Sequence, residues 1–223
     1  VFFAFAPHAK LRLLKMLNSW YYFGGLYFGG IRQRFGIMIL VSKIRELEQR
    51  LERAEQQLGL FQRISRLMTR DMSLDDVLHN IVDLLVEFME CDSCLIYLVD
   101  DGELVLYASD AADRMNIGKV RLRLDEGLTG WVARERRLLA ISREAYNDPR
   151  FKYFKDLPAD TFESFLSAPV ISQSKVVGVI NIQHRNARSH SGSEMELLTT
   201  VGEQIGCLLV LSRMNVGTPA GVA

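Results

Sequence analysis

The sequence predicts an α+β domain: an antiparallel sheet with helices on one face and a loop-built pocket on the other, preceded by a coiled-coil helix. Two observations predict it. An apolar heptad pattern runs through residues 37–64, and short apolar segments separated by turn residues follow between residues 93 and 184. Strands joined by tight turns pair antiparallel. Helical patterns before and after the strands are therefore expected to cover one face of the sheet.

The composition limits the classes of function. Hydrophobic residues make up 48% of the chain, which is enough for a core. Lys plus Arg and Asp plus Glu number 27 each, so charge gives no reason to expect nucleic acid as a partner. The chain has 3 cysteines, too few for a disulfide scaffold and typical of a reducing compartment. We therefore expect a cytoplasmic protein without a structural metal site or a cofactor.

The two ends of the chain differ from the middle. Residues 1–36 form an aromatic and Gly-rich extension with basic residues on both sides of the aromatic run. Its uncharged stretch is shorter than the roughly 20 residues that span a membrane. Two interpretations stay open: a disordered extension, or membrane association at the lipid interface. The tail, residues 215–223, is expected to be flexible.

The heptad pattern of residues 37–64 predicts a dimerisation helix. Its apolar seam contains Ile44, Leu47, Leu51, Ala54, Leu58 and Phe61. In a parallel, in-register pair of such helices, Lys43 would face Glu48 of the second copy and Arg50 would face Glu55. These charges favour a parallel homodimer. The alternative is one amphipathic helix packed on its own domain.

The domain proper is expected to cover residues 65–214. Ser73 is the expected N-cap of its first helix, and Ser193 with Glu196 the expected capping box of its last. Strands are expected at residues 93–99, 103–108, 120–124, 138–141, 165–171 and 175–183, with a short helix near Leu128. Residues 142–163 read as a long polar loop, which would serve as a lid.

Three motifs in this order resemble a known family. Residues 125–133 (DEGLTGWVA), 147–151 (NDPRF) and the segment 168–180 with its Ala-Pro-Val-Ile and Val-Gly-Val-Ile runs resemble GAF domains of bacterial signalling proteins. The GAF resemblance covers residues 58–213, and within it residues 151–153 (FKY) and 182–185 (IQHR) also resemble the GAF domain of nitrogen-related phosphoenolpyruvate phosphotransferases. The resemblance implies a PAS-like fold and small-molecule sensing, often in homodimers. It names neither the ligand nor a downstream signalling partner.

The candidate ligand-binding residues lie on the short helix, on the lid and at the end of the last strand. They are Thr129, Trp131, Asn147, Asp148, Arg150, Phe151 and His184. The turn into the short helix would leave backbone N–H groups free for an anion, and Arg150 would hold a carboxylate or phosphate. Two alternatives stay open: Gly127 and Gly130 serve only a tight turn, and residues 148–151 only staple the loop.

Three functions remain. The first is a sensor that binds an unidentified small molecule and relays through dimer helices. The second is a ligand-free dimerisation or interaction domain. The third is an enzyme of the free methionine sulfoxide reductase type, which some GAF proteins are; it would need an activated thiolate at the lid. Cys91 and Cys94 flank the start of the first strand and Cys207 is in the last helix, away from the lid. We therefore expect no catalytic residues and no enzyme.

Overall fold

The computed structural model describes residues 30–110, 114–152 and 162–216, with side chains from residue 37 to residue 212. The predicted extension and tail therefore lie outside the described residues, apart from the helical backbone of residues 30–36 and 215–216. The chain divides into two units, Val1–Ala54 and Glu55–Ala223.

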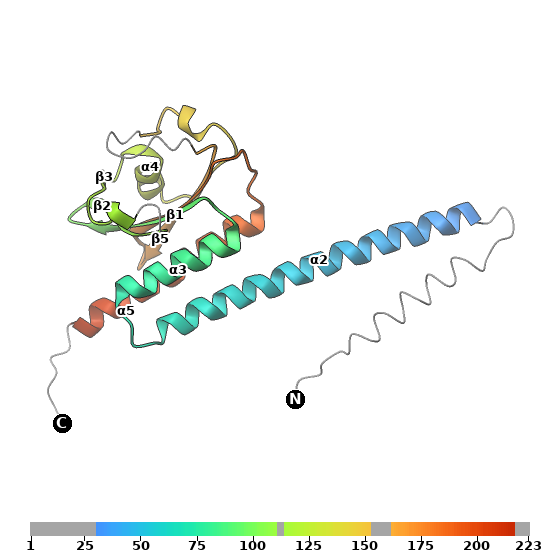
Figure 1. The fold of residues 1–223 in the computed structure, drawn as a ribbon, viewed down its shortest axis with the longest axis horizontal. Coiled ribbons are helices and arrows are strands. Elements are labelled where there is room, and N and C mark those ends of the chain that lie inside the picture. Colours follow the sequence, from blue (N-terminus) through green and yellow to red (C-terminus); the bar gives the residue numbers. More distant parts are fainter. Residues whose placement is uncertain (1–29, 111–113, 153–161, 217–223) are drawn as a thin grey trace, which may run out of the picture. The chain divides into compact units, whose positions relative to one another are not determined.

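The second unit is built on one antiparallel sheet in the order β3-β2-β1-β6-β5-β4 (Figure 1). The strands are β1 Ser93–Asp100, β2 Glu103–Ser109, β3 Arg121–Arg123, β4 Leu139–Ile141, β5 Ser164–Ser172 and β6 Lys175–His184. Two tight hairpins, β1–β2 and β5–β6, supply most of the pairing, and β1 joins them by pairing with β6. The predicted α+β fold with an antiparallel sheet is confirmed.

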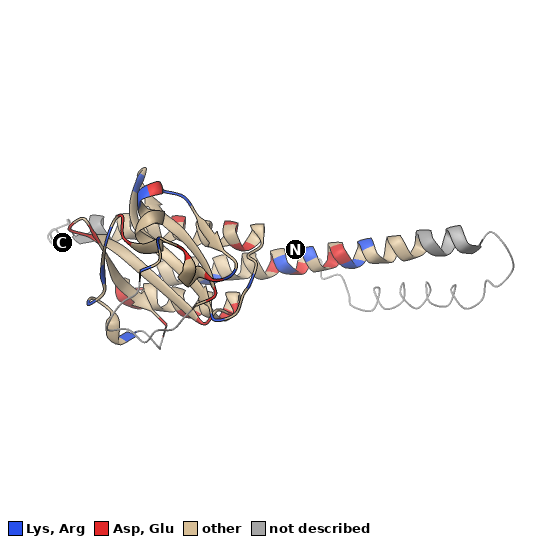
Figure 2. Cartoon of the chain, turned by 90° about the horizontal axis from the view of Figure 1, so that it is seen from above, with Lys and Arg blue, Asp and Glu red and all other residues tan. Residues whose placement is uncertain are grey.

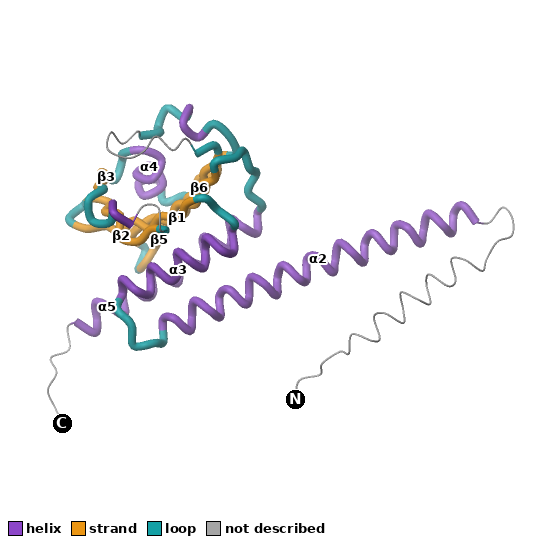
Figure 3. The backbone as a smooth tube through the Cα atoms, in the orientation of Figure 1, coloured by secondary structure: helices purple, strands orange, loops and turns teal. Residues whose placement is uncertain are grey.

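Helices cover both faces of the sheet unequally. On one face lie α3 (Leu74–Met89) and α5 (Gly192–Val216), and on the other lies the short α4 (Gly127–Glu135) (Figures 1 and 3). Side chains of β6 alternate accordingly: Ile180 and Ile182 belong to the core with α3 and α5, and Val179 to the core with α4. Two 3₁₀ turns, η1 (Arg114–Asn116) and η2 (Ala145–Asn147), lie in the connections around α4.

The last helix packs on β5 at the distance that glycine allows. A Cβ built on Gly206 would stand 2.5 Å from the carbonyl oxygen of Ile171. The helix is also long and apolar enough to span a membrane by length and composition, over Gly192–Ser212. Its inward residues Leu198, Val201 and Ile205 are fully buried in the domain core, which accounts for its hydropathy. Such a helix is weak evidence for membrane association.

Helix α2 runs from Gly30 to Met68, beyond both ends of the predicted coiled coil. In the first unit, the predicted seam residues Ile44, Leu47 and Leu51 are 42%, 52% and 60% exposed. Within one chain, Lys43 and Arg50 both pair with Glu46. Acidic and basic residues are interspersed along this part of the helix (Figure 2). Among the described residues these apolar side chains are exposed, and the predicted dimer is neither confirmed nor contradicted.

The part of α2 in the second unit passes from exposed to buried apolar side chains along its length. Leu58 is 57% exposed, whereas Leu60 and Ile64 are 3% and 0% exposed and belong to the domain core. Phe61, predicted for the dimer seam, is partly buried and packs against that same core. The apolar phase shift after Gly59 therefore marks where the helix begins to pack on its own domain.

Two helix starts test the predicted caps. The hydroxyl of Ser73 accepts a hydrogen bond from the Asp76 amide, so this N-cap is confirmed. The capping box of α5 is wrong by two residues: Glu194 accepts from the Ser191 amide and Ser191 from the Glu194 amide. Both Ser-x-x-Glu spacings are present in the sequence, and the helix begins at the earlier one.

Candidate functional site

The turn into α4 is a tightly packed corner. Gly127 has φ +68°, and a Cβ on Gly130 would stand 2.7 Å from the carbonyl oxygen of Arg123. Glu126 accepts hydrogen bonds from the amide of Arg123 and, at 2.6 Å, from Nζ of Lys152. These bonds lower the pKa of Glu126, with the Lys152 bond as the main cause. The packing supports the tight-turn interpretation of both glycines, with a carboxylate already at the helix start.

A line of buried polar side chains joins the sheet to α4. The Nδ2 of Asn181, on β6, donates to Oγ1 of Thr129 at 2.8 Å, and the hydroxyl of Ser167, on β5, donates to Oδ1 of Asn181 at 2.7 Å. Their exposed fractions are 7% for Thr129, 1% for Asn181 and 0% for Ser167. Sequence reasoning found Thr129 and missed the other two. Their signal was a polar residue inside each apolar strand.

The lid segment carries a charged clamp against α4. The guanidinium of Arg150 donates to both carboxylate oxygens of Asp148, at 2.8 and 2.7 Å, and the Arg150 amide donates to the same carboxylate. The guanidinium also lies over the ring of Trp131, 4.6 Å from its centroid. The Arg150 bond holds the pKa of Asp148 below its usual value and raises that of Arg150. These contacts support the predicted loop staple.

The remaining lid candidates have different surroundings. Phe151 packs against a small apolar cluster formed by Leu128, Ala145 and Phe165, which ties the lid to α4 and β5. Asn147 ends η2, is exposed, and donates from Nδ2 to Glu144 at 3.4 Å. The structure therefore brings Trp131, Asp148, Arg150 and Phe151 together at α4. Residues 153–161 of the predicted lid loop lie outside the described residues.

His184 does not join this group. It ends β6, is 4% exposed, and contacts Arg188 and His190 on the side of the sheet that carries α3 and α5. Asn181 and His184 are three residues apart on one strand, so their side chains point to opposite faces. The structure places this candidate on the face opposite Thr129.

The thiols lie away from α4. Cys91 and Cys94 belong to the core with α3 and α5, and Cys207 is exposed on α5. Burial raises the pKa of Cys91 to about 12 and that of Cys94 well above its usual value. A buried thiol with a raised pKa is a poor nucleophile at neutral pH. Among the described residues there is also no group of three or more His, Cys, Asp or Glu side chains able to hold a metal ion.

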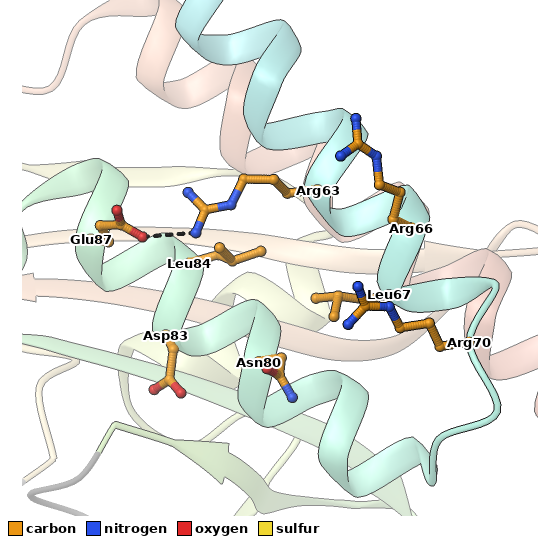
Figure 4. A pocket seen from close by; sticks show the side chains of 8 residues that line it. All are labelled: Arg63, Arg66, Leu67, Arg70, Asn80, Asp83, Leu84 and Glu87. Carbon is orange, nitrogen blue, oxygen red and sulfur yellow. Dashed lines mark hydrogen bonds and ion pairs between the residues drawn. The ribbon is translucent and has the colours of Figure 1, made fainter.

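A groove of about 330 Å³ lies between α2 and α3 (Figure 4). Its lining has two rows at helical spacing: Arg63, Arg66 and Arg70 on α2, and Asn80, Asp83 and Glu87 on α3. Leu67 and Leu84 lie between the rows. Arg63 forms an ion pair with Glu87 across the groove at 3.0 Å. Asp83 instead pairs with Arg114 of η1 at 3.7 Å. This groove is lined mainly by charged and polar side chains.

Comparison with known proteins now identifies the family. The sequence of the unit that carries this sheet, with α3 and α5 on one face and α4 on the other, matches a family model. The model, described as the GAF domain, covers residues 73–209, more than half of the chain. The chain belongs to the GAF domain family. The resemblance that the motifs predicted is confirmed, and so is the GAF-like fold.

Three relatives show how far this GAF domain resembles known ones. The phosphoenolpyruvate-dependent phosphotransferase system protein of Escherichia coli K12 is 28% identical over 144 residues, covering 64% of this chain but only 19% of that protein. The GAF domain of a phosphoenolpyruvate-protein phosphotransferase from Coxiella burnetii has a TM-score of 0.69 at 24% identity, covering 74% of this chain and 99% of that one. A free methionine-R-sulfoxide reductase from Neisseria meningitidis has a TM-score of 0.60 at 17% identity, covering 73% and 93%.

Proposed function

We propose that this GAF domain is a sensor module of a signalling protein, which binds a small molecule on the α4 face and relays its occupancy through the helices of a homodimer. The observation that carries the proposal is the buried polar line from Ser167 through Asn181 to Thr129. Buried polar groups cost free energy unless they are paired, and directed polar groups among apolar walls are typical of ligand sites. The opposite face of the same strands is lined mainly by aliphatic side chains.

The charges around α4 favour a small polar ligand without a large net charge. Arg150 is neutralised by Asp148, and Glu126 is bound to Lys152, so each of these pairs is neutral in itself. A free anion would have to displace Asp148 from Arg150, which a bidentate bond resists. The identity of the ligand stays open, and so do the downstream partner and the predicted cytoplasmic location.

A route from the site to the helices runs through β6. Asn181 faces α4, and its neighbour Ile180 faces α5. The Cδ1 atom of Ile180 lies 3.8 Å from where a Cβ on Gly202 of α5 would stand. A ligand that shifts Asn181 would therefore also shift the surface on which α5 packs. A displacement of packed helices is one known way to switch between two states.

The homodimer rests on the exposed heptad row of α2. Ile44, Leu47, Leu51 and Leu58 are each between 42% and 60% exposed in a single chain. An exposed apolar stripe of this length favours a partner helix, and the charges beside it favour a parallel one. Because Phe61 packs on its own domain, we place the end of the dimer seam near Leu58.

Two alternatives compete with the sensor. In a ligand-free dimerisation domain, the buried polar line would serve only to hold α4. In an enzyme like the free methionine-R-sulfoxide reductases, a reactive thiol would have to reach the α4 face. The raised pKa values of Cys91 and Cys94, and their place on the other face, disfavour the enzyme. The likeness to that reductase at 17% identity shows the fold alone.

The test is native mass spectrometry of the purified full chain. The proposal expects an assembly of twice 25.4 kDa that carries an additional small mass, released on collisional activation. The double variant Thr129→Val, Asn181→Leu should lose that mass, since it replaces both partners by apolar groups. Thr200→Val is the matched control, because Thr200 bonds within α5 and away from α4. A bare wild-type dimer would favour the ligand-free alternative, and retention of the mass by the double variant would place the ligand elsewhere.

A further inference from the structure

Buried polar atoms without a partner gather at one end of the helix-covered face. Of the described side chains, five buried nitrogen or oxygen atoms form no hydrogen bond, and four of them belong to Ser164, His184 and His190. Ser164 and His184 are paired across β5 and β6, and the rings of His184 and His190 lie 5.5 Å apart. The exposed fractions of Ser164, His184 and His190 are 0%, 4% and 8%.

One arginine ties this cluster to three elements. Arg188 donates to the backbone oxygen of Met89, at the end of α3, at 2.9 Å. It also contacts Nε2 of His184 at 3.1 Å and pairs with Glu194 in the first turn of α5. A guanidinium can only donate, so Nε2 of His184 must be the acceptor and the imidazole must be neutral. The bond that joins β6 to Arg188 therefore exists only while His184 carries no proton on Nε2.

The geometry points to a proton-sensitive latch: protonation of His184 or His190 breaks the contact between His184 and Arg188 and thereby weakens the link that Arg188 makes from the end of β6 to the first turn of α5. A proton on Nε2 of His184 would turn an acceptor into a second donor facing a cation. A proton on His190, which is 8% exposed, would add a buried charge beside His184 and Arg188. The latch acts whether or not the α4 face binds a ligand.

The groups around the cluster set the direction of the response. Burial lowers the pKa of His184, and Arg188 lowers it further, while the Met89 carbonyl, Asp92 and Glu194 oppose the shift. Burial also lowers the pKa of His190, with His184 as the next cause. The closed latch thus binds protons less readily than the open one. The equilibrium constant for closing the latch is therefore highest above pH 6.5, the ordinary histidine pKa. It falls as the pH drops below that value, by up to about tenfold per pH unit for each histidine.

We expect the response to pH at the first turn of α5. Glu194 keeps a lowered pKa: burial would raise it, but the amide and hydroxyl of Ser191 and the Arg188 cation outweigh burial. Glu194 is an anion that faces both histidines, and a protonated histidine would compete with Arg188 for it. At the centre of the sheet, on the face that carries α3 and α5, the described side chains around Ile180 and Ile182 are apolar. We therefore expect no pH response there.

The experiment is hydrogen exchange of the full chain at pH 7.5 and 5.5, read as protection factors so that the intrinsic pH dependence is removed. In the wild type, protection of amides 192–198 should fall at least tenfold at pH 5.5 while amides of β1 and β6 keep theirs. The variant His184→Gln with His190→Leu should lose this pH response, because glutamine still accepts from Arg188 and neither residue titrates. His79→Gln, on α3 and outside the cluster, should respond as the wild type does.

Two results would overturn the latch. One is a wild type whose α5 start is equally protected at both pH values. The other is a double variant that loses protection to the same extent as the wild type. Should the double variant fail to fold, the imidazole resonances of the wild type decide: both clustered histidines must titrate below 6.5, and titration of either at or above 6.5 would refute the latch.

Discussion

Asn181 donates a hydrogen bond to Thr129 across 2.8 Å and thereby joins the central strand β6 to the helix α4. Asn181 is 1% exposed, so its amide depends on this partner and on Ser167 for its hydrogen bonds. The bond belongs to the buried polar line, and Asn181 is next to Ile180, which packs toward α5. Its contribution to stability can be measured apart from any ligand.

The first prediction concerns this bond. Thr129→Val should destabilise the domain by ~1–3 kcal/mol, because it leaves the Asn181 amide buried without an acceptor. Thr129→Ser, which keeps the hydroxyl, should cost less. Adding Asn181→Leu to Thr129→Val should cost less than the sum of the two single changes. Urea unfolding of the wild type and the four variants measures this, and strict additivity would show that the two side chains are not coupled.

The second prediction concerns α5 and its glycine. Gly206→Ala should destabilise by ~1–3 kcal/mol, since a Cβ there would stand 2.5 Å from the Ile171 carbonyl oxygen and the helix would have to move. Gly59→Ala is the matched control: nothing lies within 4 Å of a Cβ at that position in α2. Because alanine favours the helix, this control should gain up to ~1 kcal/mol. Equal effects of the two changes on the urea midpoint would contradict the close packing of α5 on β5.

The third prediction concerns acid and the lid clamp. The pKa of Asp148 is lowered by Arg150, so the clamp stabilises the domain above the ordinary aspartate value and loses this contribution as the pH falls through the lowered one. Arg150→Ala should cost ~1 kcal/mol at pH 7, a modest value because the pair is partly exposed. The difference between wild type and variant should shrink at pH 3. A difference that grows on acidification would mean that the clamp is not what holds Asp148 ionised.

The fourth prediction concerns the thiols. With a disulfide reagent at pH 8, Cys207 should react quickly because it is exposed. Cys91 and Cys94 should react only after unfolding, because both are buried and the pKa of Cys91 is raised to about 12. Cys207→Ser should then abolish the fast phase. A second fast thiol in the folded protein would revive the enzyme alternative.

Sequence and structure agree where a local rule decides. The Ser73 cap and the two hairpins follow from short patterns, and both are present. The Ser-x-x-Glu pattern occurs twice in overlapping positions, and local sequence alone did not select Ser191 over Ser193. The helical rule predicted the heptad row but did not show that Phe61 turns onto its own domain.

The candidate site was harder to predict, because its parts come from distant segments. Thr129 and Asn181 are 52 residues apart, so only the folded sheet brings them into contact. The sequence predicts His184 as a ligand residue with the lid, but the structure has it on the other face of the sheet, as its odd spacing from Asn181 requires. Arg150 was foreseen both as an anion holder and as part of a staple, and the Asp148 pair supports the staple.

The central claim is that two copies join through the exposed row of α2 in parallel. Its most direct test is disulfide cross-linking of Leu47→Cys, in a Cys207→Ser background. Leu47 of one chain would face Leu47 of the second chain only in a parallel, in-register pair. Gln49→Cys, two positions along the helix and pointing away from the seam, is the control. We predict rapid cross-linking of Leu47→Cys to a covalent dimer under mild oxidation and little of Gln49→Cys; equal yields, or no dimer from either, would contradict the account.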